Sequence, residues 1–214
     1  MMKRRDFSLA VGATLAGATA LPALAQQRFE AGKDYQPLDK PAPVDAPSGK
    51  IEVVEFFWYN CPHCNAFEPA LEAWIKRQPK DVSVRRVPVA FSSAYQGQQR
   101  LYYALEAMGL VDKIHPKVFQ AIHGERKRLE SPDVIADWMA TQGVDKAKFM
   151  EQFNSFSVAS KATRAGQVTD AYRVEGVPAL GVAGRFYTDG TMTRSMERSL
   201  QVVDYLVGEI RRGR

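Results

Sequence analysis

Two cysteines separated by two residues are the strongest chemical signal in this chain of 214 residues. Cys61, Pro62, His63 and Cys64 stand in a row, and the sequence holds no other cysteine. Such spacing allows a disulfide, but a bridge across so short a loop removes little entropy from the unfolded chain. The pair therefore predicts exchange of its disulfide with other thiols rather than structural cross-linking.

The surrounding residues favour the thiolate form of Cys61. A helical pattern follows the motif, so Cys61 is expected at a helix start, where unpaired backbone N–H groups and the helix dipole stabilise negative charge. His63 adds a positive charge or a hydrogen bond, and Pro62 restricts the loop so that the sulfurs lie within bonding reach. A stabilised thiolate makes a disulfide easier to reduce, so the pair should be an oxidant.

Three other uses of a Cys-x-x-Cys motif remain open. A zinc site needs about four ligands, and the only further candidates of that kind are His115 and His123, which we expect at helix ends in capping or surface roles. Covalent haem attachment needs a histidine directly after the second cysteine, where this chain has Asn65. A purely structural disulfide is the third. We expect no metal and no cofactor.

The hydrophobic pattern of the residues on either side of the motif predicts their secondary structure. Residues 51–58 are a nearly continuous apolar, β-branched and aromatic run, typical of a strand buried on both faces, and Glu55 is the exception in it. A helical period begins after Asn60. Residues 82–91 alternate as in a second strand, which Pro88 places at an edge or in an irregular ladder. The sequence thus predicts strand, helix, strand.

The remaining strands are separated from these by a long helical stretch. Residues 98–172 show helical periodicity throughout, and strand patterns return at 179–182 and 186–187 before a last amphipathic helix. We therefore predict an α/β fold, in which residues 92–172 form a helical subdomain inserted between the two halves of one domain, 50–91 and 173–214. Residues expected in the core of the insertion include Val134, Ile135, Trp138, Phe149, Phe153 and Phe156.

The N-terminus predicts export. Three basic residues precede an apolar stretch at 7–21, and Ala23-Leu24-Ala25 fits a cleavage site, so residues 1–25 are expected to be a signal peptide cut after Ala25. A twin-arginine signal, an ordinary secretion signal and an anchor helix are the alternatives. Residues 26–49 are rich in proline and are expected to lie extended over the surface. The net charge of +5 and scattered basic pairs argue against a nucleic-acid surface.

The chain resembles a known family over nearly its whole mature length. The matching segments, Phe56-Phe57, Cys61-Pro62-His63-Cys64, Phe67-Glu68 and Gly176-Val177-Pro178, are similar to those of the DsbA family of periplasmic thiol:disulfide oxidases. This resemblance implies a thioredoxin fold, with a central mixed sheet flanked by helices and an inserted helical subdomain. It also implies a periplasmic location.

The resemblance implies a role for each residue of the motif. Cys61 is the exposed nucleophile that forms mixed disulfides, Cys64 the shielded resolving cysteine, and His63 the main stabiliser of the Cys61 thiolate. Val177 and Pro178 form the cis-proline loop that faces the disulfide. A cis bond there leaves backbone groups of Val177 free to pair with a substrate strand.

Three charged residues are implied to support the site. Glu55 resembles the buried acid beneath the cysteines, Glu68 is a candidate second carboxylate, and Arg86 stands where the family usually carries lysine. Arginine does not readily release a proton, so a proton relay would depend on Glu55 and water. The alternative is that Glu55 and Arg86 form a buried ion pair of structural value.

The sequence predicts a monomeric oxidase that transfers its disulfide to reduced exported proteins. By resemblance, a membrane quinone-linked oxidase of the DsbB type reoxidises it. An isomerase or reductase of the same fold is one alternative, although only residues 26–50 precede the first strand, and Val177 stands where such enzymes commonly carry threonine. A non-enzymatic periplasmic chaperone or binding module is the other.

Overall fold

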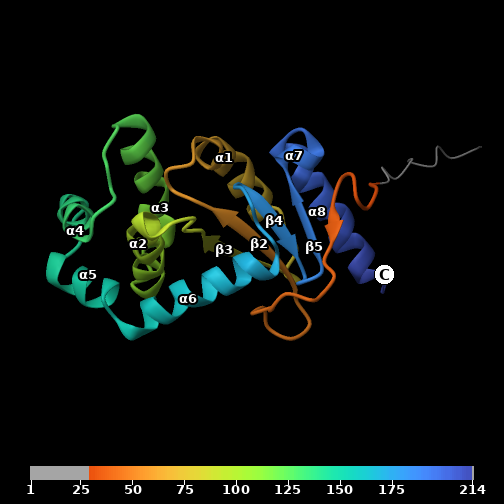
Figure 1. Cartoon of the computed structure of the whole chain (residues 1–214), viewed down its shortest axis with the longest axis horizontal. Helices are drawn as coiled ribbons and strands as arrows, with labels where there is room; N and C mark the ends of the chain where they lie inside the picture. The colour runs from red at the N-terminus through yellow and green to blue at the C-terminus, as the bar shows by residue number, and fades with distance from the viewer. Residues whose placement is uncertain (1–28, 214) are drawn as a thin grey trace, which may run out of the picture.

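A mixed sheet forms the centre of the protein (Figure 1), as seen in a computed structural model that describes residues 29–213. The expected signal peptide therefore lies outside the described residues. The sheet order is β1-β5-β4-β2-β3, and only β2 and β3 are parallel. The strands are β1 (Gln36–Pro37), β2 (Ile51–Phe57), β3 (Val82–Pro88), β4 (Ala179–Val182) and β5 (Phe186–Asp189).

Helices lie on both sides of the sheet and form a separate group beside it. The helix α1 (Pro62–Lys76) follows β2, and the helices α7 (Gly190–Thr193) and α8 (Met196–Arg211) follow β5. The group beside the sheet comprises η1 (Ser93–Tyr95), α2 (Gln96–Ala107), α3 (Val111–Phe119), the π-turn η2 (Gln120–Gly124), α4 (Pro132–Thr141) and α5 (Lys146–Phe153). The long helix α6 (Phe156–Ala171) leads back from this group to the sheet (Figure 1).

Two hydrophobic cores hold these layers together. On one face of the sheet, Val53 packs with side chains of α1 and α8, among them Trp74 and Leu206. On the other face, Phe56 contacts Tyr172, with ring centroids 5.2 Å apart, and this core continues into the helical group. Because β2 residues alternate between two buried faces, the strand is hydrophobic on both, with Glu52 and Glu55 as its exceptions.

The predicted α/β fold is confirmed, and the strand patterns fall where the structure has β2, β3, β4 and β5. β3 is an edge strand that ends at Pro88. The N–H of Val89 still donates to the carbonyl of Phe57 on β2, so proline is tolerated at this edge without loss of that contact. The prediction of a core position is wrong for two residues: Val134 is 46% exposed and Phe156 is 86% exposed. Both occupy the first turn of a helix, α4 and α6 respectively, where the apolar stripe has not yet met its neighbours.

The segment before β2 packs more closely than expected. Gln36 and Pro37 pair with β5 and close the free edge of the sheet, and the backbone N–H of Leu38 donates to the carbonyl of Arg185 at 2.8 Å. Phe29 and Ala42 are buried in the two cores. This segment therefore protects a sheet edge that would otherwise expose unpaired backbone groups.

Candidate active site

The cysteine motif lies where β2 gives way to α1. Cys61 is the residue that precedes the first turn of α1, and Pro62 occupies the first helical position, where its missing N–H is not needed. The N–H of Cys61 donates to the carbonyl of Trp58 at 3.0 Å and fixes the turn. Cys61 is 7% exposed and Cys64 is fully buried, and both are free thiols.

The two thiols differ strongly in acidity. A hydrogen bond from the Cys64 thiol lowers the pKa of Cys61 to about 6, against the opposing effect of burial. The N–H groups of Cys64 and His63 and the charge of His63 add smaller contributions, whereas the resemblance implied the leading role for His63. Burial and the neighbouring Cys61 raise the pKa of Cys64. The Cys61 sulfur is thus mostly ionised at neutral pH, and the Cys64 sulfur stays protonated. Cys61 is nevertheless buried rather than exposed as the resemblance implied, because the loop at Val177 lies against its sulfur.

A loop from the far end of the chain faces the cysteines. The peptide bond between Val177 and Pro178 is cis, as the resemblance implied. The Cys61 thiol donates to the carbonyl oxygen of Val177, with 3.3 Å between Sγ and oxygen. Residues 116 positions apart in the sequence therefore meet at the reactive sulfur.

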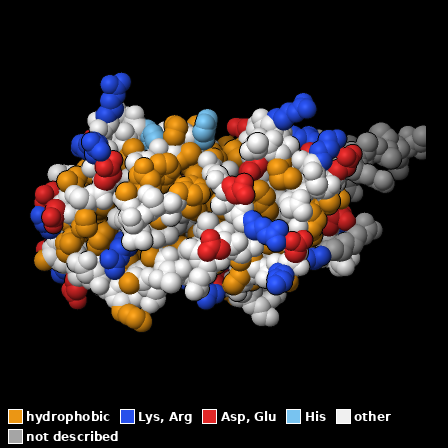
Figure 2. Space-filling model, in the orientation of Figure 1, with side chains coloured by type: hydrophobic (Ala, Val, Ile, Leu, Met, Phe, Trp, Pro, Cys, Tyr) orange, Lys and Arg blue, Asp and Glu red, His pale blue; other side chains and the backbone are white. Residues whose placement is uncertain are grey.

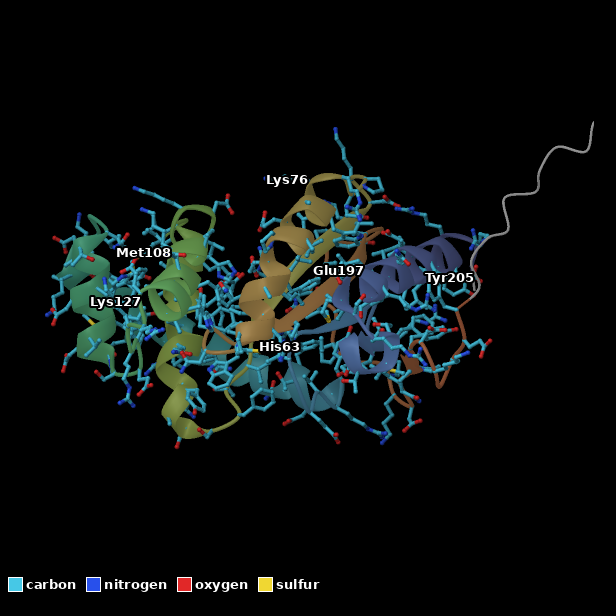
Figure 3. All side chains as sticks on the ribbon, turned by 90° about the horizontal axis from the view of Figure 1, so that it is seen from above. His63, Lys76, Met108, Lys127, Glu197 and Tyr205 are labelled. Atoms are coloured by element: carbon cyan, nitrogen blue, oxygen red, sulfur yellow. The ribbon has the colours of Figure 1, made fainter. Side chains whose placement is uncertain are left out.

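A groove of about 460 Å³ opens beside this contact. Its lining includes His63, Val177, Pro178, Thr191, Arg194 and Met196. Figure 3 shows His63 at the start of α1, on the side that faces α7. Figure 2 shows histidine side chains beside a group of hydrophobic side chains on the upper surface of the molecule. An extended peptide could lie in such a groove with a sulfur near Cys61.

A buried carboxylate lies beneath the motif. The parallel register of β2 and β3 sets Glu55 opposite Arg86, and Arg86 Nε donates to Glu55 Oε2 at 3.0 Å. Glu55 is fully buried, and its Oε1 has no hydrogen-bond partner. Burial, together with the negative charge of Glu68, raises the pKa of Glu55 to about 8. Glu55 is therefore protonated at neutral pH.

Arg86 binds more than one acid. Besides Glu55, its Nη2 contacts Glu68 Oε2 at 3.4 Å and Glu72 Oε1 at 2.6 Å. Glu68 and Glu72 are one turn apart on α1 and so share a face of that helix. Although burial acts in the opposite direction, these carboxylates raise the pKa of Arg86, which remains charged. The ion pair of Glu55 with Arg86, which the sequence offered as an alternative of structural value, is present, and Glu68 and Glu72 bind the same arginine.

The expectation of a surface or capping role for His115 is wrong. His115 is 2% exposed inside α3, with its ring between Tyr59 Oη at 2.8 Å and Glu68 Oε1 at 3.3 Å. Its spacing of four from Phe119 was a signal that could have placed it on the buried face of the helix. His123 Nε2 donates to the carbonyl of Tyr59 at 2.8 Å. Both histidines thus contact the loop that leads to Cys61.

Residues 29–213 contain no helix that is long and apolar enough to cross a membrane. In the same part of the chain, no three side chains of His, Cys, Asp or Glu are grouped so that they could hold a metal ion.

Known proteins are similar to this chain in sequence and in fold. The family model of the DSBA-like thioredoxin domain matches residues 52–201. The thiol:disulfide interchange protein DsbA of Burkholderia cepacia is 43% identical over 204 residues, which cover 95% of this chain and 93% of that protein. Its namesake from Bordetella pertussis is 43% identical over 212 residues, 99% of this chain and 100% of that protein. A crystal structure of Pseudomonas aeruginosa DsbA superposes with a TM-score of 0.82 at 41% identity, and covers 86% of this chain and 96% of that one.

Proposed function

This chain belongs to the DSBA-like thioredoxin domain family, and we propose that it donates the disulfide of Cys61 and Cys64 to reduced exported proteins. It is a thiol:disulfide oxidoreductase with a thioredoxin-like fold. The proposal that the enzyme donates its disulfide, rather than reducing others, rests on the difference in acidity between the two thiols. Because the Cys61 pKa of about 6 makes this sulfur a good leaving group, the reduced form of the pair is stabilised.

Exchange proceeds in two displacements. A substrate thiolate attacks Cys61 Sγ, the Cys61–Cys64 bond breaks, and Cys64 leaves as a thiolate that takes up a proton. A second substrate thiolate then attacks the substrate sulfur of the mixed disulfide. Cys61 leaves as a thiolate, the substrate gains its disulfide, and the enzyme is reduced.

Supporting residues take up three tasks in this mechanism. Protonated Glu55 supplies the proton that Cys64 needs, because its pKa is raised to about 8 and it lies close enough to Cys64 for its ionised form to raise the pKa of that thiol. Arg86 and Glu68 hold Glu55 in place. The backbone of Val177, next to Pro178, exchanges its contact with Cys61 for a substrate strand in the groove.

The setting is proposed from the N-terminus and the relatives. The basic and apolar residues before Ala25 support export to the periplasm, where reduced proteins arrive after secretion. A membrane quinone-linked oxidase of the DsbB type would return the enzyme to its oxidised form. We propose that the enzyme acts as a monomer.

Oxidised enzyme, from which residues 1–25 have been removed, should transfer its disulfide to a reduced unfolded protein with two cysteines. We expect one substrate disulfide for each enzyme disulfide consumed, measured by alkylation of free thiols. A variant with both Cys61→Ala and Cys64→Ala should form none. Faster reshuffling of a scrambled protein than oxidation of a reduced one would instead favour the isomerase.

A further inference from the structure

His115 connects the helical group to the buried acids beneath the cysteines. Its ring lies among Phe57, Tyr102 and Phe119, whose centroids are 5.1 to 5.7 Å away. Within this apolar setting both ring nitrogens have polar partners: Nδ1 faces the hydroxyl of Tyr59, and Nε2 faces Glu68. A buried histidine with two such partners has a defined orientation and a defined tautomer.

The partners determine where the imidazole proton lies. Burial raises the pKa of Tyr59 well above its usual value, so its hydroxyl keeps its proton and donates to Nδ1. Burial also lowers the pKa of His115, which is therefore neutral and carries its proton on Nε2. Nε2 then donates to Glu68 Oε1.

This donation affects how two acids share one proton. Burial raises the pKa of Glu68, but the hydrogen bond from His115, the charge that His115 carries when it is protonated, and the charge of Arg86 outweigh burial, and the pKa is lowered. Glu55 has only Arg86 as a partner, and its other oxygen is unpaired. Other charged groups that act on His115 are Arg86 and Glu72. Without His115, Arg86 would be the remaining polar partner of Glu68 as it is of Glu55, and the two acids would compete for it.

We propose that His115 is a positioning residue that keeps Glu68 ionised and so directs the proton of the buried acid cluster to Glu55, beside Cys64. This proposal rests on the proposed function for its purpose. The placement of the proton can nevertheless be measured without any exchange reaction.

The test is a ¹³C NMR titration of the glutamate carboxyl groups in the reduced mature enzyme, assigned with Glu55→Gln and Glu68→Gln. In the wild type, one buried carboxyl should titrate near pH 8 and Glu68 below its ordinary value of 4.5. In His115→Phe, which keeps a ring among the aromatic neighbours, the Glu68 midpoint should rise by at least about one pH unit. The proton is then shared, and the pH profile of exchange should broaden.

His115→Gln is the matched control, because its amide can donate to Glu68 and accept from Tyr59. It should restore the Glu68 midpoint to within a few tenths of a pH unit of the wild type. The remaining difference is on the order of the effect of losing a weak hydrogen bond. If His115→Phe does not fold, Tyr59→Phe removes the donor to Nδ1 and should shift Glu68 in the same direction by less. An unchanged Glu68 midpoint in a folded variant overturns the proposal. Failure of the wild type to exchange thiols would overturn the proposed function alone.

Discussion

Replacing Cys64 with alanine should leave Cys61 trapped in mixed disulfides, whereas replacing Cys61 should abolish exchange. In Cys64→Ala the Cys61 thiolate still attacks a partner's disulfide, but no neighbouring thiol remains to release it. In the wild type, with a pKa of about 6, about nine in ten Cys61 groups are ionised at pH 7. In Cys64→Ala the hydrogen bond that lowers this pKa most is lost, so Cys61 is less ionised there, although the N–H of His63 and the charge of His63 still favour its thiolate. Cys64 is fully buried and its pKa is raised, so in Cys61→Ala it offers almost no thiolate.

The measurement uses glutathione disulfide as the partner and mass spectrometry of the acid-quenched protein. Cys64→Ala should carry one glutathione per chain, and Cys61→Ala should react at least about 100-fold more slowly, because its remaining thiol is seldom ionised. Wild type should carry little adduct, since Cys64 releases it. Equal reaction of the two variants would contradict the assigned roles of the cysteines.

Replacing Glu55 with glutamine should remove the pH dependence of exchange near pH 8. Glutamine keeps an oxygen for Arg86 Nε but cannot give a proton to Cys64. We expect exchange with a dithiol peptide to slow by about tenfold at pH 7, since water must replace the acid. Stopped-flow rates between pH 5 and 9 measure this, and an unaltered profile would remove Glu55 from the mechanism.

The same variant should be more stable than the wild type. The pKa of Glu55 is raised to about 8 in the folded protein from 4.5, so folding favours its protonated form, and stability falls as the pH rises through this range. Removing the charge should therefore add about 1–3 kcal/mol at pH 8 and little at pH 4. Arg86 keeps Glu68 and Glu72 as partners. Urea unfolding at both pH values gives the comparison, and Glu72→Gln, at a half-exposed position, is the control.

The parts of the fold that sequence predicts are those with strong local patterns. The hydrophobic run of β2, the period change after Asn60 and the proline at the end of β3 each have a local physical cause. β1 has none: its two residues pair with β5 only because that strand has a free edge, 150 positions later in the chain. An isolated pattern of two residues carries no strand signal.

The site divides in the same way. The motif at 61–64 identifies the chemistry, because the residue types and spacing are sufficient. The contact of Tyr59 with His115 spans 56 positions and depends on how α3 meets the loop after β2, which no local pattern determines. The order of contributions to the Cys61 pKa likewise depends on the position of the Cys64 thiol and of nearby N–H groups, not on residue types alone.

The most direct test of the central claim is the reduction potential of the Cys61–Cys64 pair from pH 5 to 9, measured in glutathione buffers with alkylation of free thiols. Lowering the Cys61 pKa from 9 to about 6 stabilises the reduced form at pH 7 by about 1.4 kcal/mol, or about 30 mV. The potential should lie above the roughly −270 mV of thioredoxin, whose reactive cysteine has a pKa of about 7. Its slope should fall from about 59 to about 30 mV per pH unit near pH 6, since reduction then takes up one proton instead of two. A potential near −270 mV, with an unbroken slope to pH 8, would contradict a disulfide donor driven by the Cys61 thiolate.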